Sequence, residues 1–120
     1  MVVLGGSNCA AKLLNSVEVY SSGSWSTPLP AMNTNRSDYP ASGYAVISGE
    51  QRIYVCGGWA TNSLKTCEYL NIGLKKWNNI PANMSIARSY PLSVVLSDGV
   101  SFIICGGHNG YYENLGYQRS

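Results

Sequence analysis

The strongest constraint on this chain is a short pattern that occurs three times, an apolar strand ending in two consecutive glycines. "RIYVCGG" covers residues 52–58, "SFIICGG" covers 101–107, and the variant "VVLGG" covers 2–6. The glycine pairs begin at residues 5, 57 and 106, so the copies are 52 and 49 residues apart. Recurrence at a period of roughly 20–50 residues is typical of repeat architectures. We therefore expect one supersecondary unit per copy.

Three further residue types keep this spacing: a tryptophan, a methionine and an arginine. They lie 19, 26 and 30 residues after the second glycine of their copy, as Trp25, Met32 and Arg36 and again as Trp77, Met84 and Arg88. An acidic residue followed by a tyrosine lies between the glycines and the tryptophan, in "VEVY" (17–20) and in "CEY" (67–69). So many shared features in one order indicate a tandem repeat.

The local pattern within each period predicts four antiparallel strands. A strand, turn and strand are expected at 44–48 and 52–56 around "GEQ", and at 92–97 and 100–105 around Asp98-Gly99, a favourable hairpin dipeptide. Third strands are expected at 16–20 and 65–72, and fourth strands at 24–29 and 76–80, with proline ending the ladder. No stretch shows a sustained helical period, so the sequence predicts an all-β fold.

This pattern resembles the kelch repeat, in which an apolar strand ends in Gly-Gly. A tyrosine follows in the third strand, a tryptophan opens the fourth, and an arginine starts the next blade. The matching structural residues are Gly5, Gly6, Tyr20 and Trp25; Gly57, Gly58, Tyr69 and Trp77; and Gly106 and Gly107. Arg36 and Arg88 match the blade-opening arginine.

The resemblance implies kelch-type β-propeller blades of four antiparallel strands. We expect about two blades plus a partial one, an incomplete propeller. Its divisions would be a partial blade at 1–38, a full blade at 39–89 and a partial blade at 90–120, with a possible third strand at 111–117. The resemblance also implies that the paired tyrosine and tryptophan of each copy are packing residues.

Ring closure leaves three interpretations open. A propeller typically has about 4–8 blades, and six kelch blades of about 50 residues need roughly 300 residues. This chain has 120. It is a portion of a longer kelch protein, or one of several copies that complete a ring together, or a short open piece that a partner stabilises.

The cysteines predict a reducing compartment. Cys56 and Cys105 occupy the position that Leu4 fills in the first copy, so the position is expected to be buried and apolar. We therefore expect reduced core thiols rather than a disulfide or metal ligands. The N-terminus shows no charged segment followed by an apolar stretch and a cleavage site. A cytoplasmic location is the resulting expectation.

The inventory of reactive side chains argues against an enzyme. The chain has one histidine and six acidic residues, and no catalytic-triad or phosphate-loop motif is present. We expect no catalytic residue, no metal and no cofactor. The net charge of +2 comes without a basic run, which argues against nucleic acid or an anionic membrane as partner. No window has eighteen consecutive apolar residues, so no membrane span is predicted.

Binding is the favoured function. The resemblance places the loops after the glycine pairs, and the residues that open each blade, at one mouth of the propeller. In kelch substrate adaptors, blade-opening arginines often contact acidic peptides. The candidate partner-binding residues are Arg36, Arg88, Asn8, Trp59, Asn62, His108, Asn109, Tyr111 and Tyr112. For the two arginines, an equally open alternative is a structural role, closing each blade through bonds to backbone carbonyls.

The resulting hypothesis is a protein–protein interaction module that binds a partner protein or peptide at the loop mouth. The resemblance suggests the substrate-recognition part of a ubiquitin-ligase adaptor as its setting. One alternative is a cytoskeleton-associated scaffold protein. Another, from a different class, is a propeller enzyme or sugar-binding propeller whose site lies in further blades.

Overall fold

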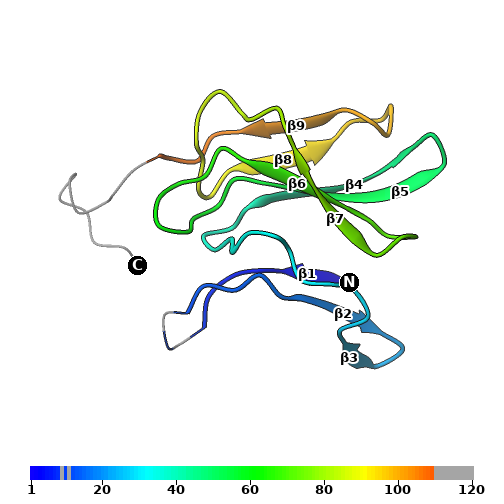
Figure 1. Ribbon diagram of the computed structural model, residues 1–120. Helices are drawn as coiled ribbons and strands as arrows, with labels where there is room; N and C mark the ends of the chain where they lie inside the picture. Colours follow the sequence, from blue (N-terminus) through cyan, green and yellow to red (C-terminus); the bar gives the residue numbers. More distant parts are fainter. Residues whose placement is uncertain (9, 11, 110–120) are drawn as a thin grey trace.

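The chain forms three antiparallel sheets that lie next to one another (Figure 1). The computed structural model describes residues 1–8, 10 and 12–109, and among these it contains strands and no helix. The first sheet holds β1 (Val2–Leu4), β2 (Val17–Ser21) and β3 (Ser24–Ser26). The middle sheet holds β4 (Ala41–Ile47), β5 (Glu50–Cys56), β6 (Cys67–Asn71) and β7 (Lys76–Ile80). The third holds β8 (Leu92–Val95) and β9 (Phe102–Cys105). The predicted all-β class with four-stranded antiparallel blades is confirmed.

The middle sheet is a complete up-and-down unit, with strand order β4-β5-β6-β7. Its first hairpin turns at Ser48 and Gly49, where φ is 51° and 79°. Two positive φ values in a two-residue loop define a turn that matches the twist of the strands. The turn therefore lies one residue earlier than "GEQ" suggested, and Glu50 is the first residue of β5 rather than a turn residue.

The three sheets repeat one register. Leu4 pairs with Val17 between β1 and β2, as Cys56 pairs with Cys67 between β5 and β6. Leu92 pairs with Cys105 between β8 and β9, as Ala41 pairs with Cys56 between β4 and β5. The strand expected at 111–117 lies outside the described residues.

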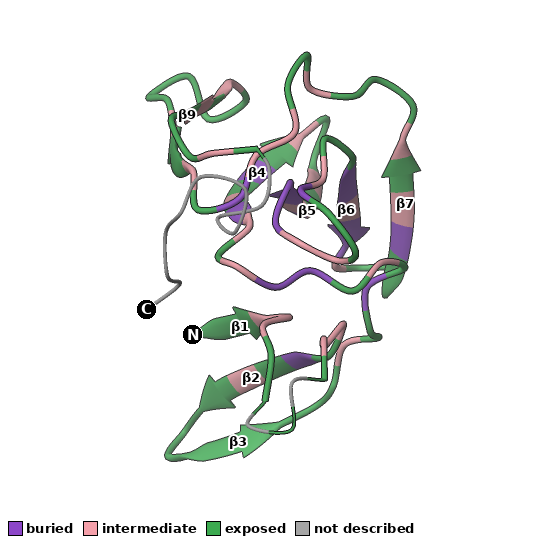
Figure 2. Cartoon of the chain, turned by 90° about the vertical axis from the view of Figure 1, so that its left-hand side faces the viewer, coloured by how far each residue is buried: buried purple, intermediate pink, exposed green. Residues whose placement is uncertain are grey.

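The core lies between neighbouring sheets, and buried residues gather around the middle sheet (Figure 2). Residues from the first and middle sheets form one cluster: Val17, Met32, Ile53, Val55, Leu70 and Trp77. A second cluster of Ala41, Cys56 and Cys67 packs against Phe102 and Ile104 of the third sheet. Each interface therefore depends on residues from two successive copies of the repeat.

Of the repeat tyrosines and tryptophans only Trp77 is buried, so the packing expected of these residues differs between the two copies. Trp77 is 6% exposed and donates from Nε1 to the carbonyl oxygen of Pro30 at 2.8 Å. Trp25 is 50% exposed, and its ring lies 5.2 Å from that of Tyr20, which is also exposed. Tyr69 is half-buried. The difference arises because the segment that leaves the first sheet covers Trp77.

No helix able to cross a membrane occurs in the part of the chain that the structure describes.

Candidate functional site

The glycine pairs are the points at which one sheet meets the segment opening the next. The second glycine donates its backbone N–H to the carbonyl oxygen of the following arginine, Gly6 to Arg36 at 2.8 Å and Gly58 to Arg88 at 2.8 Å. A Cβ on Gly57 would lie 2.5 Å from that Arg88 oxygen. Gly57 also has φ +71°, a region that side chains disfavour. A side chain at position 57 is therefore disfavoured both by the close carbonyl oxygen and by the backbone conformation.

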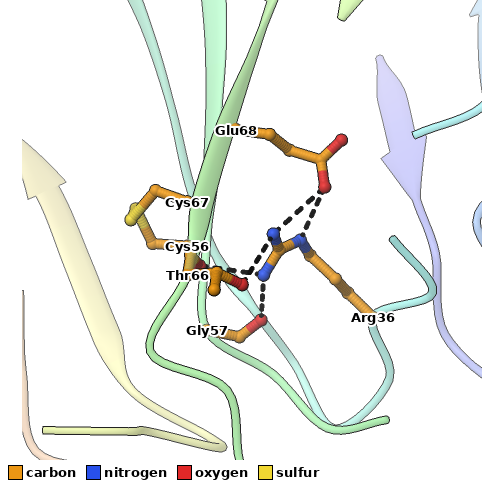
Figure 3. Close-up of a disulfide and its surroundings, with 6 residues drawn as sticks. All are labelled: Arg36, Cys56, Gly57, Thr66, Cys67 and Glu68. Carbon is orange, nitrogen blue, oxygen red and sulfur yellow. Dashed lines mark hydrogen bonds and ion pairs between the residues drawn. A yellow bond between two sulfur atoms is a disulfide. The ribbon is translucent and has the colours of Figure 1, made fainter. Parts of the chain in front are cut away.

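The Arg36 side chain extends in the opposite direction, into the middle sheet (Figure 3). Its Nη1 donates to the carbonyl oxygens of Gly57 and Thr66, each at 2.9 Å. Its Nε and Nη2 donate to one oxygen of Glu68 at 3.1 and 3.0 Å. The other Glu68 oxygen accepts the backbone N–H of Asn33 at 2.7 Å. Arg36 thus joins two sheets, through its backbone to the first and through its side chain to the middle one.

The Arg36–Glu68 ion pair is fully buried, with side chains 1% and 0% exposed. Burial lowers the pKa of the Arg36 guanidinium, and the charge and hydrogen bonds of Glu68 oppose that shift. Removing either partner of such a buried pair destabilises the fold, because the remaining side chain becomes a buried charge without a counter-charge.

The contacts of Arg36 match a structural role, in which the arginine closes a blade by bonding backbone carbonyls. Its guanidinium bonds backbone carbonyls and Glu68, and it lies away from the surface. Arg88 makes the equivalent bond to the carbonyl oxygen of Gly106 at 2.6 Å but remains partly exposed. Of the two arginines, only Arg88 lies where a partner molecule could reach it.

Cys56 and Cys67 form a disulfide, so the prediction of reduced core thiols is wrong for Cys56. The two residues are directly opposite each other on β5 and β6, with Cα atoms 4.2 Å apart. Both are buried, beside the Arg36–Glu68 pair (Figure 3). The repeat signalled an apolar position, and only the strand register brings Cys67 to it.

Cys105, at the equivalent position in the third sheet, is a free thiol and is exposed. The prediction of a buried position is therefore wrong there too. In the middle sheet β6 pairs with β5 at Cys56, whereas the described part of the third sheet has no strand in the equivalent place beside β9. Cys9 lies outside the described residues.

Trp59 and His108 occupy matching places at one end of the sheets. Ser37 and Trp59 exchange two backbone hydrogen bonds, each 2.9 Å, and Ser89 and His108 do the same at 2.9 and 3.0 Å. Each pair joins a blade-opening segment to a loop that follows a glycine pair. The segments after β1, β5 and β9 all lie on the left of Figure 1. We call this end the loop face; it comprises residues 5–8, 36–40, 58–63, 88–91 and 106–109.

The remaining sequence candidates also lie on the loop face where the structure describes them. Asn8, Asn62 and Asn109 are exposed, while Trp59 and His108 are half-buried. The Asn8 side chain accepts the backbone N–H groups of Ala10 and Lys12, each at 3.1 Å, and so shapes its own loop. Tyr111 and Tyr112 lie outside the described residues.

The sequence interpretation missed a group of side chains in the blade-opening segments. The rings of Tyr39 and Tyr90 lie 5.2 Å apart, and that of Tyr90 stacks on His108 at 5.6 Å. Asp38 precedes Tyr39, and a pocket of about 440 Å³ opens beside these residues. The available signal was the repeated "RSDYP" at 36–40 and "RSYP" at 88–91.

The side chains of the loop face are of kinds that proteins use for recognition. Among residues 1–8, 10 and 12–109, no group of three or more His, Cys, Asp or Glu side chains is placed to hold a metal ion. The loop face offers aromatic rings, exposed amides and one accessible arginine, Arg88. Aromatic and arginine side chains often dominate protein interfaces.

The antiparallel blades repeat, and a backbone hydrogen bond from a glycine to an arginine joins each blade to the segment that opens the next. This arrangement defines a β-repeat protein of the propeller type. Residues 40–84 match the family described as the Kelch motif. The match spans the middle sheet and ends at Met84, which supports a kelch repeat in this part of the chain. No curated protein matches the chain significantly.

Proposed function

We propose that this chain is a protein-interaction module that binds a partner protein or peptide on its loop face. The observation that carries the proposal is the pairing of two kinds of loop at one end of the sheets. The backbone bonds from Ser37 to Trp59 and from Ser89 to His108 hold the blade-opening segments against the loops after the glycine pairs. Rigid strands thus present a continuous set of loop side chains, the arrangement in which binding residues are commonly found.

The exposed side chains suit this role. Trp, Tyr and Arg are enriched among the residues that dominate binding energy. Trp59, Tyr90 and Arg88 each belong to the loop face, and each keeps part of its surface exposed. Kelch motifs generally mediate protein binding, which is consistent with the match at residues 40–84.

The setting of the module is a separate and finer proposal. Substrate recognition in a ubiquitin-ligase adaptor follows from the family resemblance alone, and cullin binding by a parent protein would test it. Further blades, from a second copy or from a longer chain, would cover exposed apolar residues such as Leu92, which is 74% exposed. A cytoplasmic location is likewise a proposal, and the Cys56–Cys67 disulfide removes the reduced-thiol argument for it.

Selection from a random peptide library on the folded chain tests the proposed function. We expect enriched peptides whose binding weakens about tenfold or more in Trp59→Ala or His108→Ala, the loss typical of residues that dominate an interface. The matched control is Leu74→Ala. Leu74 is 75% exposed in the β6–β7 turn, at the opposite end of the middle sheet. Peptides that lose affinity only in the Leu74 variant, or no enrichment at all, would contradict the loop face as the binding surface.

A further inference from the structure

A pocket on the loop face lies between the first glycine pair and the two blade-opening segments. Its volume is about 440 Å³, within the usual range for ligand pockets. Backbone of Gly5 and Gly6 forms one wall, and Asp38, Tyr39, Pro40 and Tyr90 form the other. The pocket therefore exists only where the first sheet meets the segments that open the next two.

The tyrosine rings at this pocket are accessible and held in place. Tyr39 is 74% exposed and Tyr90 is 37% exposed, with ring centroids 5.2 Å apart. The backbone N–H of Tyr90 donates to the carbonyl oxygen of Asp38 at 2.9 Å, which ties the two opening segments together. His108 stacks on Tyr90 from the neighbouring loop.

The backbone at this pocket adopts a costly conformation. Asp38, Tyr39 and Tyr90 have φ values of 54°, 51° and 53°, in the left-handed region that residues other than glycine seldom adopt. Residues in such conformations cluster at binding and active sites, where the surrounding structure holds them. Here they set the positions of the carboxylate and both rings.

The pocket is locally acidic, although the whole chain has a net charge of +2. Asp38 supplies a carboxylate, and none of the described residues that line the pocket is a lysine or an arginine. An ionised carboxylate can accept up to about four hydrogen bonds, so the contacts of Asp38 within the chain do not by themselves exclude a ligand. The electron-rich faces of tyrosines attract cations as well.

We propose that this pocket binds an arginine side chain of the partner. The planar guanidinium stacks on Tyr39 or Tyr90 while its N–H groups donate to the carboxylate of Asp38. Lysine fits less well, because its compact ammonium neither stacks nor donates to a carboxylate in a bidentate manner. The inference deepens the proposed function and rests on it. It also reverses the charge expected of the ligand, since Arg36 pairs with Glu68 inside the structure.

The test uses the short peptide acetyl-Gly-Gly-Arg-Gly-Gly-amide and NMR of the whole chain. We expect saturable shifts at the amides of Gly5, Gly6, Asp38 and Tyr90, with a dissociation constant of about 1 mM, as suits a single side chain. The citrulline peptide has nearly the same shape without the charge, and we expect it to bind about tenfold more weakly. Added salt should weaken the arginine peptide further.

Two variants distinguish binding at the pocket from a non-specific attraction of the peptide to negative charge. Asp38→Asn should lower the affinity for the arginine peptide about threefold to fivefold, whereas Asp98→Asn, the same change in the β8–β9 turn, should leave it unchanged. Equal binding of the arginine and citrulline peptides, or unchanged binding in Asp38→Asn, would overturn the inference. Library peptides that bind the loop face but lack arginine would also overturn it, while the proposed interaction function would stand.

Discussion

Arg36 and Arg88 hold the same relationship to successive glycine pairs. Each accepts, at its backbone carbonyl, the N–H of the second glycine of the preceding sheet, Gly6 or Gly58. Each then donates from Nη1 to the carbonyl oxygen of the first glycine of the following sheet, Gly57 or Gly106. One residue per repeat therefore joins two neighbouring sheets.

Removing Arg36 should destabilise the protein far more than removing Arg88. Arg36→Ala leaves the carboxylate of Glu68 buried without its partner, at a cost of about 3–5 kcal/mol in unfolding free energy. Arg88→Ala loses one hydrogen bond from a partly exposed side chain, about 1 kcal/mol. Urea unfolding measures both.

A double variant identifies the cause. Arg36→Met with Glu68→Leu removes both charges, and we expect it to recover most of the stability lost in Arg36→Ala. An unfolding free energy no higher than that of Arg36→Ala would mean that the carbonyl bonds, and not the stranded charge, account for the loss.

Gly57→Ala should cost more than the same change at Gly106. Both glycines have φ +71°, so alanine pays the same backbone cost of about 1–2 kcal/mol at each position. At Gly57 the new Cβ would also lie 2.5 Å from the Arg88 carbonyl oxygen, while none of the described residues lies within 4 Å of a Cβ at Gly106. The difference in melting temperature isolates the steric contribution. Equal shifts would contradict the close approach of the two backbones.

Breaking the Cys56–Cys67 disulfide should lower the unfolding free energy by about 3 kcal/mol, as expected for closure of a loop of this length. Cys56→Ala with Cys67→Ala is the informative variant, measured beside the oxidised protein. Cys105→Ser, at an exposed free thiol, is the control, with an effect within about 0.5 kcal/mol. Alkylation and peptide mapping should label Cys105 without reductant, and Cys56 and Cys67 only after reduction. Labelling of Cys56 and Cys67 without reductant would exclude the disulfide.

The two repeat tryptophans should differ in their contribution to stability. Trp77→Phe leaves the Pro30 carbonyl without its donor and should cost about 1–3 kcal/mol. Trp25→Phe, at the same repeat position but 50% exposed, should stay within about 0.5 kcal/mol. Unfolding followed by circular dichroism measures both variants in parallel, and similar losses would show that Trp25 is buried in solution.

The carboxyl of Asp98 should titrate at an unusually low pH. The Ser101 hydroxyl, the backbone N–H of Ser101 and that of Val100 donate to it and hold its pKa below the ordinary value. Its contribution to stability is therefore present at neutral pH and is lost as the pH falls through the lowered pKa. NMR titration of the carboxyl carbon measures this, and an ordinary Asp pKa would show that the turn is open in solution.

The spacing of glycines, tryptophans and arginines was enough to predict the strands, their order and the blade architecture. Turns and strand alternation depend on residues that are close together in the sequence, so short segments are sufficient to predict them. The resemblance to the kelch repeat also implied which loops share one end. The acidic pocket was missed because Asp38, Tyr39 and Tyr90 belong to segments without strand periodicity.

The contacts between copies were decided by the tertiary structure. Whether Arg36 faces a partner or Glu68, whether Cys56 is a thiol or a disulfide, and whether a repeat tryptophan is buried all depend on residues brought in by another strand or another sheet. The repeat makes Arg36 and Arg88, or Trp25 and Trp77, equivalent in sequence. Their burial differs because packing is set by neighbours in space, and Glu68 and Pro30 lie beside only one member of each pair.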